Sequence, residues 1–187
     1  MGKNKKGSLP SGYASHWQAS LQAGLPKAGW LLVVETSAQS MLAIHSGKEE
    51  TRHPISTSRD GLGEKEHSYR TPRGLHEIAD RIGGDQPAGS VFSCRRPTGR
   101  ILPPERWKSA GHEDLILTRI LRLRGLEPGR NAGLGLDSYA RNIYLHGTNH
   151  EHLLGTPVSH GCIRMANQAI AELFDRIGAT PAWCLVE

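Results

Sequence analysis

Short apolar stretches alternate with polar, glycine-rich segments from residue 30 to the C-terminus. Residues 30–35 and 41–45 are apolar and flank the polar segment 36–40, which predicts a β-hairpin. Residues 114–123 are apolar on both alternating faces, as in a strand buried between two layers. Further strands are predicted over residues 53–57, 73–79, 90–95, 141–145 and 181–186, with a surface loop over 58–69 and turns over 83–85 and 125–135. The pattern predicts a mainly β domain.

Two segments show helical spacing. Near the C-terminus, apolar residues at 170, 173, 174 and 177 predict one packed helix, with Asn167 as its N-cap and Gly178 at its end. Trp17 and Leu21 lie one turn apart in a short amphipathic segment, residues 13–23, which we interpret as a docking arm. Residues 1–12 are polar and typical of a flexible leader. We therefore divide the chain into a leader and arm, 1–29, and one domain, 30–187.

Composition narrows the class of protein. The 187 residues are 37% hydrophobic and 22% charged, as expected for one globular domain, and 22 glycines and 11 prolines favour short strands and turns. The net charge of +5 suits an anionic polymer such as cell wall. Nucleic acid is disfavoured, because no aromatic residues interleave with the basic ones. No apolar stretch predicts a membrane-spanning helix, and residues 1–12 have no apolar segment of a secretory signal.

Three cysteines cannot all pair with one another, so at least one thiol is free or bonds elsewhere. Cys94 and Cys184 lie in strand-like apolar stretches and are interpreted as small buried hydrophobic residues, although a disulfide between them is the alternative. Cys162 differs, because a glycine and two histidines surround it. This cysteine is the candidate nucleophile.

The chemistry concentrates in two segments, His-Gly-Thr at 146–148 and Ser-His-Gly-Cys-Ile-Arg-Met at 159–165. A cysteine attacks as its thiolate and needs a base, for which His146 and His160 are candidates. Gly161 permits a tight turn that lets backbone N–H groups converge on an oxyanion. Arg164 supplies a fixed positive charge that can hold a substrate carboxylate. These are the parts that acyl transfer requires.

These two segments resemble the signature of L,D-transpeptidases, the YkuD-type catalytic domain. Pro-Ile-Ser-Thr at 54–57 and Thr-Pro-Arg-Gly at 71–74 are similar to further family features, so the resemblance spans residues 30–186. It implies a β-sandwich-like fold and a thioester on Cys162 formed with peptidoglycan stem peptides, releasing the terminal D-residue. It also implies carbapenem-type inhibitors and no cofactor.

The resemblance also assigns roles within the motif. It implies that His146, rather than His160, is the general base, oriented by the backbone carbonyl of Gly147. The pocket and oxyanion hole would be shaped by Ser159, His160 and Gly161, and Arg164 and Thr148 would bind substrate. We expect a monomer in the periplasm or cell envelope, with an export route that the sequence does not identify.

Several alternatives stay open. The acyl group can pass to a neighbouring stem, to a D-amino acid or to water. With water as acceptor the enzyme is an L,D-carboxypeptidase or amidase, and a wall-targeting toxin belongs to this alternative. A non-catalytic wall-binding module is another class. A zinc site could use His146, His150, His152, His160 and Cys162, but these residues lack the spacing that fixes metal geometry, so no metal is expected. Arg164 could instead form a structural salt bridge.

Overall fold

The computed structural model describes residues 28–108 and 113–187. The predicted leader, residues 1–12, and the predicted helix over 13–23 lie outside these residues. The described part of the chain is 44% strand and 11% helix, so the prediction of a mainly β fold is confirmed. Its strands are β1 (Trp30–Glu35), β2 (Ser40–His45), β3 (Lys48–Ser56), β4 (Gly74–Ile82), β5 (Ser90–Ser93), β6 (Arg96–Ile101), β7 (Ile116–Gly125), β8 (Tyr144–Gly147), β9 (Ile163–Met165) and β10 (Ala182–Val186).

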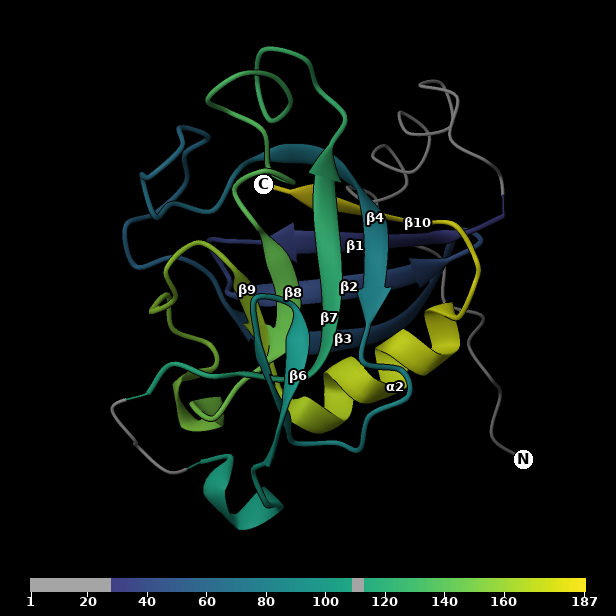
Figure 1. The fold of residues 1–187 in the computed structure, drawn as a ribbon. Coiled ribbons are helices and arrows are strands. Elements are labelled where there is room, and N and C mark those ends of the chain that lie inside the picture. Colours follow the sequence, from purple (N-terminus) through teal and green to yellow (C-terminus); the bar gives the residue numbers. More distant parts are fainter. Residues whose placement is uncertain (1–27, 109–112) are drawn as a thin grey trace, which may run out of the picture.

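The strands form one sheet in the order β4-β10-β1-β2-β3-β9-β8-β7-β5-β6, and β4 also pairs with β7. This second pairing closes the first eight strands of that order into a ring, with β5 paired to β7 and β6 paired to β5. Strands β1, β2, β3 and β10 run across β4, β7 and β8 as two facing layers (Figure 1). Two pairs, β1 with β10 and β8 with β9, are parallel, and the other pairs are antiparallel.

The main core lies between these layers and includes helix α2 (Asn167–Ile177). Leu32 and Val34 of β1 face it, whereas Leu31 and Val33 face a second apolar cluster. Strand β1 is therefore buried on both faces. The core side of α2 carries Ile170, Leu173 and Ile177, at the spacing of one helix face. Two short 3-10 turns, η1 (Pro104–Arg106) and η2 (Glu151–Leu153), lie in the connections.

Several element predictions are confirmed. The hairpin of β1 and β2, the buried strand β7 and the C-terminal strand β10 all form. Gly178 ends α2 with φ 50°, a left-handed conformation that glycine adopts without steric cost.

Other predictions are corrected. Asn167 is the first residue of α2 rather than its N-cap, and Ala166 occupies the cap position. The Asn167 side chain is buried, donates to the Thr148 carbonyl oxygen at 2.7 Å and accepts from Thr118 Oγ1 at 2.6 Å, so contacts between elements determine its role. Strand β6 was missed, because all its residues are exposed and it has no apolar face.

Strand β8 begins at Tyr144 instead of residue 141, so His146 lies inside the strand. Cys94 is exposed in the turn between β5 and β6 with φ 48°, which corrects the prediction that it is buried. Cys184 is buried as predicted, and both thiols are free, so the alternative disulfide does not form in this structure.

Candidate active site

The parallel pair β8 and β9 places three of the predicted residues together. His146 of β8 is the register partner of Arg164 of β9, and Cys162 lies just before β9. Alternate residues of an extended segment share a side, so Cys162 and Arg164 face the same way. Together these side chains line a cavity of about 120 Å³, whose other lining residues are Asp114, Ile116, Ser159 and His160.

His146 is held as a neutral base. Its side chain is buried, and Nδ1 lies 2.7 Å from the Gly147 carbonyl oxygen. A carbonyl only accepts, so Nδ1 carries the proton and Nε2 presents a lone pair. Burial lowers the pKa of His146 to about 4, while the hydrogen bond to Gly147 and the charge of Asp114 oppose that shift. At neutral pH the imidazole is therefore uncharged and able to accept a proton.

Cys162 is held as a thiol. It packs beside Phe92, Ile120 and Tyr144, and its Sγ lies 3.5 Å from the Asn142 carbonyl oxygen. Burial raises the pKa of Cys162 to about 11. Both shifts favour a neutral thiol and a neutral imidazole in the resting site over a thiolate–imidazolium pair.

The turn before Cys162 depends on its serine and glycine. Gly161 has φ 122°, a conformation that side chains disfavour. Ser159 Oγ donates to the Cys162 carbonyl oxygen at 2.6 Å and accepts from the Gly161 N–H at 3.2 Å. Thr71 Oγ1 donates to the Gly161 carbonyl oxygen at 3.0 Å, which ties the turn to the segment before β4. These hydrogen bonds set the direction in which the Cys162 backbone and side chain point.

Asp114 is a residue of this cavity that the sequence did not reveal. Its Oδ2 accepts from Arg164 Nη2 at 2.5 Å and from His160 Nδ1 at 3.1 Å. The Arg164 side chain is only 4% exposed. In this structure its buried guanidinium pairs with the Asp114 carboxylate, which is a partner within the protein. Burial raises the pKa of Asp114, but Arg164, His146 and His160 together bring it below its usual value. No sequence signal separates Asp114 from other surface acids.

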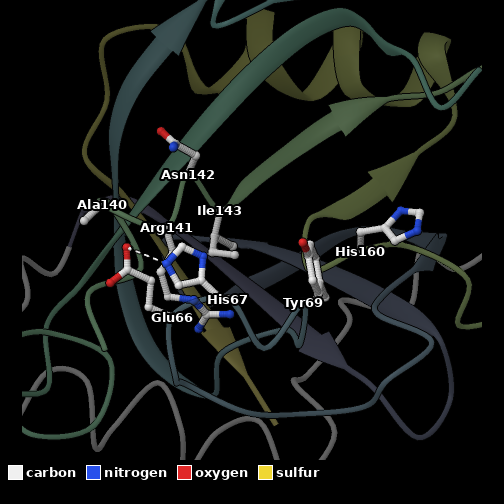
Figure 2. Close-up of a pocket in the computed structure, with 8 residues that line it drawn as sticks. All are labelled: Glu66, His67, Tyr69, Ala140, Arg141, Asn142, Ile143 and His160. Atoms are coloured by element: carbon white, nitrogen blue, oxygen red, sulfur yellow. Dashed lines mark ion pairs between the residues drawn. The ribbon is translucent and has the colours of Figure 1, made fainter. Parts of the chain in front are cut away.

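A second cavity, of about 340 Å³, shares His160 with the first. Figure 2 shows Tyr69 between His160 on one side and Glu66, His67 and Arg141 on the other. The Tyr69 and His160 rings meet edge to face, with centroids 6.5 Å apart. Tyr69 is 62% exposed and has φ 57°. The two cavities therefore share His160, one member of this aromatic pair.

Arg141 holds the wall of this second cavity. Its guanidinium donates to the carbonyl oxygens of Gly63 (3.1 Å), Glu64 (2.8 Å) and Arg70 (2.6 Å). The loop between β3 and β4, predicted as a surface loop, is thereby attached to the segment that leads into β8.

Some predicted residues lie outside both cavities. The Thr148 side chain is buried, and its Oγ1 accepts from the His150 N–H at 3.1 Å, so it does not reach the lining of either cavity. The His150 and His152 rings contact each other edge to face at 6.0 Å, in and beside η2. Within residues 28–108 and 113–187 no three metal-binding side chains cluster, and no helix is long and apolar enough to cross a membrane.

Solved structures share this fold. An L,D-transpeptidase (residues 123–326) from Xylanimonas cellulosilytica superposes with a TM-score of 0.52 at 20% identity, over 91% of this chain and 68% of that one. LdtMt1 in complex with imipenem gives 0.51 at 16% identity, over 86% and 59%. L,D-transpeptidase 3 from Mycobacterium tuberculosis in complex with a faropenem-derived adduct gives 0.50 at 17%, over 86% and 60%.

The sequence identifies the family. The model of the L,D-transpeptidase catalytic domain, YkuD, matches residues 29–183, and the chain belongs to this family. No curated protein matches the chain in sequence. The chain spans about 59% of the length of LdtMt1.

Proposed function

We propose that this protein catalyses acyl transfer on peptidoglycan stem peptides, with Cys162 as nucleophile and His146 as general base. The observation that carries the proposal is that the Cys162 thiol and the His146 imidazole line the same cavity. The Nδ1 atom of this imidazole is held by the Gly147 carbonyl oxygen. Family membership supports the reaction class. We further propose that the protein acts in the cell envelope, where its polymer substrate lies.

The first half-reaction forms a thioester. His146 Nε2 takes the proton of the Cys162 thiol while Sγ attacks the carbonyl of the diamino acid, in the amide bond that joins it to the terminal D-residue of the donor stem. The tetrahedral intermediate collapses with cleavage of the C–N bond, and the imidazolium returns the proton to the leaving amine of the terminal D-residue. Because both groups start uncharged, charge develops only as the bond forms.

The second half-reaction reverses these roles. An amine acceptor attacks the thioester carbonyl and gives its proton to His146. The C–S bond then breaks, and the imidazolium reprotonates the departing sulfur. Water in place of the amine gives hydrolysis.

The turn at residues 159–161 supports the same reaction. Ser159 and Gly161 fix the backbone ahead of Cys162, where we propose that N–H groups stabilise the oxyanion. Arg164 is proposed to attract a substrate carboxylate, and Asp114 is the internal group that shares its guanidinium. A role for Thr148 in binding would be indirect, through the turn after β8.

Incubation with tetrapeptide muropeptides and mass spectrometry of the products tests the proposal. Loss of one D-residue, with a new amide to an amine acceptor, is expected for the wild type and not for Cys162→Ala. Release of the D-residue with only a free acid would identify water as the acceptor. Unchanged muropeptides with the folded wild type, or identical products with Cys162→Ala, would overturn the proposal.

A further inference from the structure

One carboxylate oxygen organises the charged side of the Cys162 cavity. Asp114 Oδ2 lies 2.5 Å from Arg164 Nη2 and 3.1 Å from His160 Nδ1. Arg164 comes from β9 and His160 from the turn before it, whereas Asp114 belongs to the segment that leads into β7. The carboxylate therefore connects two parts of the chain 50 residues apart.

Two hydrogen bonds hold the backbone around Asp114 in place. The buried Asn149 side chain accepts from the Leu115 N–H at 3.0 Å and donates to the Glu113 carbonyl oxygen at 2.8 Å. These two hydrogen bonds flank Asp114 on both sides in the sequence. Because they join the segment to the loop after β8, Asp114 keeps a defined position relative to His146.

The ion pair between Asp114 and Arg164 also determines the net charge next to the Cys162 thiol. A bare guanidinium beside Cys162 would favour the thiolate, and a bare carboxylate would favour the thiol. Both effects act on this cysteine: Asp114 raises the pKa of Cys162 and Arg164 lowers it, in addition to the larger effect of burial. The ion pair brings the two opposite charges into contact, so each opposes the effect of the other.

We propose that Asp114 is a positioning residue of this site, which holds the Arg164 guanidinium and the His160 imidazole in place and cancels the charge of Arg164 beside the thiol. The proposal deepens the acyl-transfer function and rests on it for the effect on activity. The charge effect itself can be measured without any peptidoglycan substrate.

Alkylation of Cys162 by iodoacetamide provides that measurement, because the reagent is uncharged and reacts with the thiolate. A Cys94→Ser background removes the exposed second thiol, and Cys184 is buried. The groups that act on Cys162 and can titrate or carry charge are Asp114, Arg141, Tyr144, His146, His160 and Arg164. Only Asp114 and Arg164 are changed in the test.

Asp114→Asn keeps the size of the side chain but leaves the Arg164 charge unopposed. We expect the apparent pKa of Cys162 to fall by about one pH unit, which raises the alkylation rate at pH 7.5 about tenfold. We expect Arg164→Gln to lower that rate about tenfold, and the double variant Asp114→Asn/Arg164→Gln to alkylate within about twofold of the wild type. Acylation by a donor stem should slow at least tenfold in Asp114→Asn, because His160 and Arg164 lose their common partner.

Asp80→Asn is the matched control. Asp80 pairs with Arg122 at 3.4 Å and is about as exposed as Asp114, at 35% against 36%, but it does not line the cavity. This variant should leave alkylation unchanged.

Opposite changes in alkylation and acylation for Asp114→Asn would support the proposal. A merely structural role predicts instead that neither the pH profile nor the alkylation rate responds to charge. Alkylation at the wild-type rate in both single cavity variants, or equal acceleration in Asp80→Asn, would overturn it. Absence of muropeptide turnover in the wild type would refute the proposed function and leave the charge effect on alkylation standing.

Discussion

Replacement of His146 by glutamine tests the neutral thiol–imidazole pair most sharply. Glutamine can still donate to the Gly147 carbonyl oxygen, but it offers no basic nitrogen to the thiol. Loss of a general base costs about 10²–10⁴ in rate, so acylation of Cys162 at pH 7 should fall by that factor.

The size of this loss in rate follows from the pKa of the Cys162 thiol. With a pKa of about 11, four pH units above neutrality, only about one Cys162 in 10⁴ is ionised at pH 7. Reaching the thiolate without a base therefore costs about 5 kcal/mol at 1.36 kcal/mol per pH unit. In the proposed mechanism His146 lowers this cost by taking the proton during attack.

The wild type and the His146→Gln variant should differ in the pH dependence of acylation as well as in its rate. The pKa of His146 is about 4, so wild-type acylation should change little between pH 6 and 9. The His146→Gln variant must react through its thiolate, and its rate should rise about tenfold per pH unit over the same range.

The assay is the rate of covalent adduct formation with imipenem, followed by intact-mass spectrometry. His160→Gln is the comparison variant and should lose less activity, because its imidazole is held by Asp114 at the edge of the cavity. A wild-type rate that rises tenfold per pH unit would refute the neutral pair. Near wild-type acylation by His146→Gln, together with an inactive His160→Gln, would reverse the two roles.

Three further predictions concern charge, stability and metal. Arg164→Ala should lower kcat/KM for a free-acid tetrapeptide by one to two orders of magnitude, about 1.5–3 kcal/mol, and less for its amidated analogue; equal losses would show that Arg164 does not read the carboxylate. His76, like His146, is buried with its pKa lowered from 6.5 to about 4, mainly by burial. Unfolded chains bind these protons first, so the free energy of unfolding should fall by about 3 kcal/mol per histidine as pH drops from 6.5 to 4. Urea unfolding at both pH values measures this, and a flat stability would contradict it. Exhaustive chelation should leave acyl transfer intact; stoichiometric zinc by elemental analysis, with activity lost on its removal, would contradict a metal-free site.

Local patterns predicted the strands β1 and β2, the helix α2 and the cysteine motif. In these segments the apolar spacing matches the element, and residues 159–165 are adjacent in the chain. Strand β6 shows no such apolar spacing, because all its residues are exposed. It forms through the turn after β5 and through its pairing with that strand.

The rest of the site depends on contacts that no local pattern encodes. Asp114 meets Arg164 only because β7, β8 and β9 are neighbours in the sheet. Asn167 has the residue type of an N-cap, but its hydrogen bonds to Thr118 and Thr148 override that preference. The pairing of strands and the packing of connections bring such distant residues together, so their roles became apparent only from the fold.

The most direct test of the central role of Cys162 is the intact mass of the protein after incubation with imipenem. A strained β-lactam carbonyl presents the same target to the nucleophile as the donor amide, so one adduct per wild-type chain is expected. Peptide mapping should place that adduct on Cys162, and Cys162→Ala should remain unmodified while Cys94→Ser is modified like the wild type. The same adduct on Cys162→Ala would contradict the assignment of Cys162 as the nucleophile.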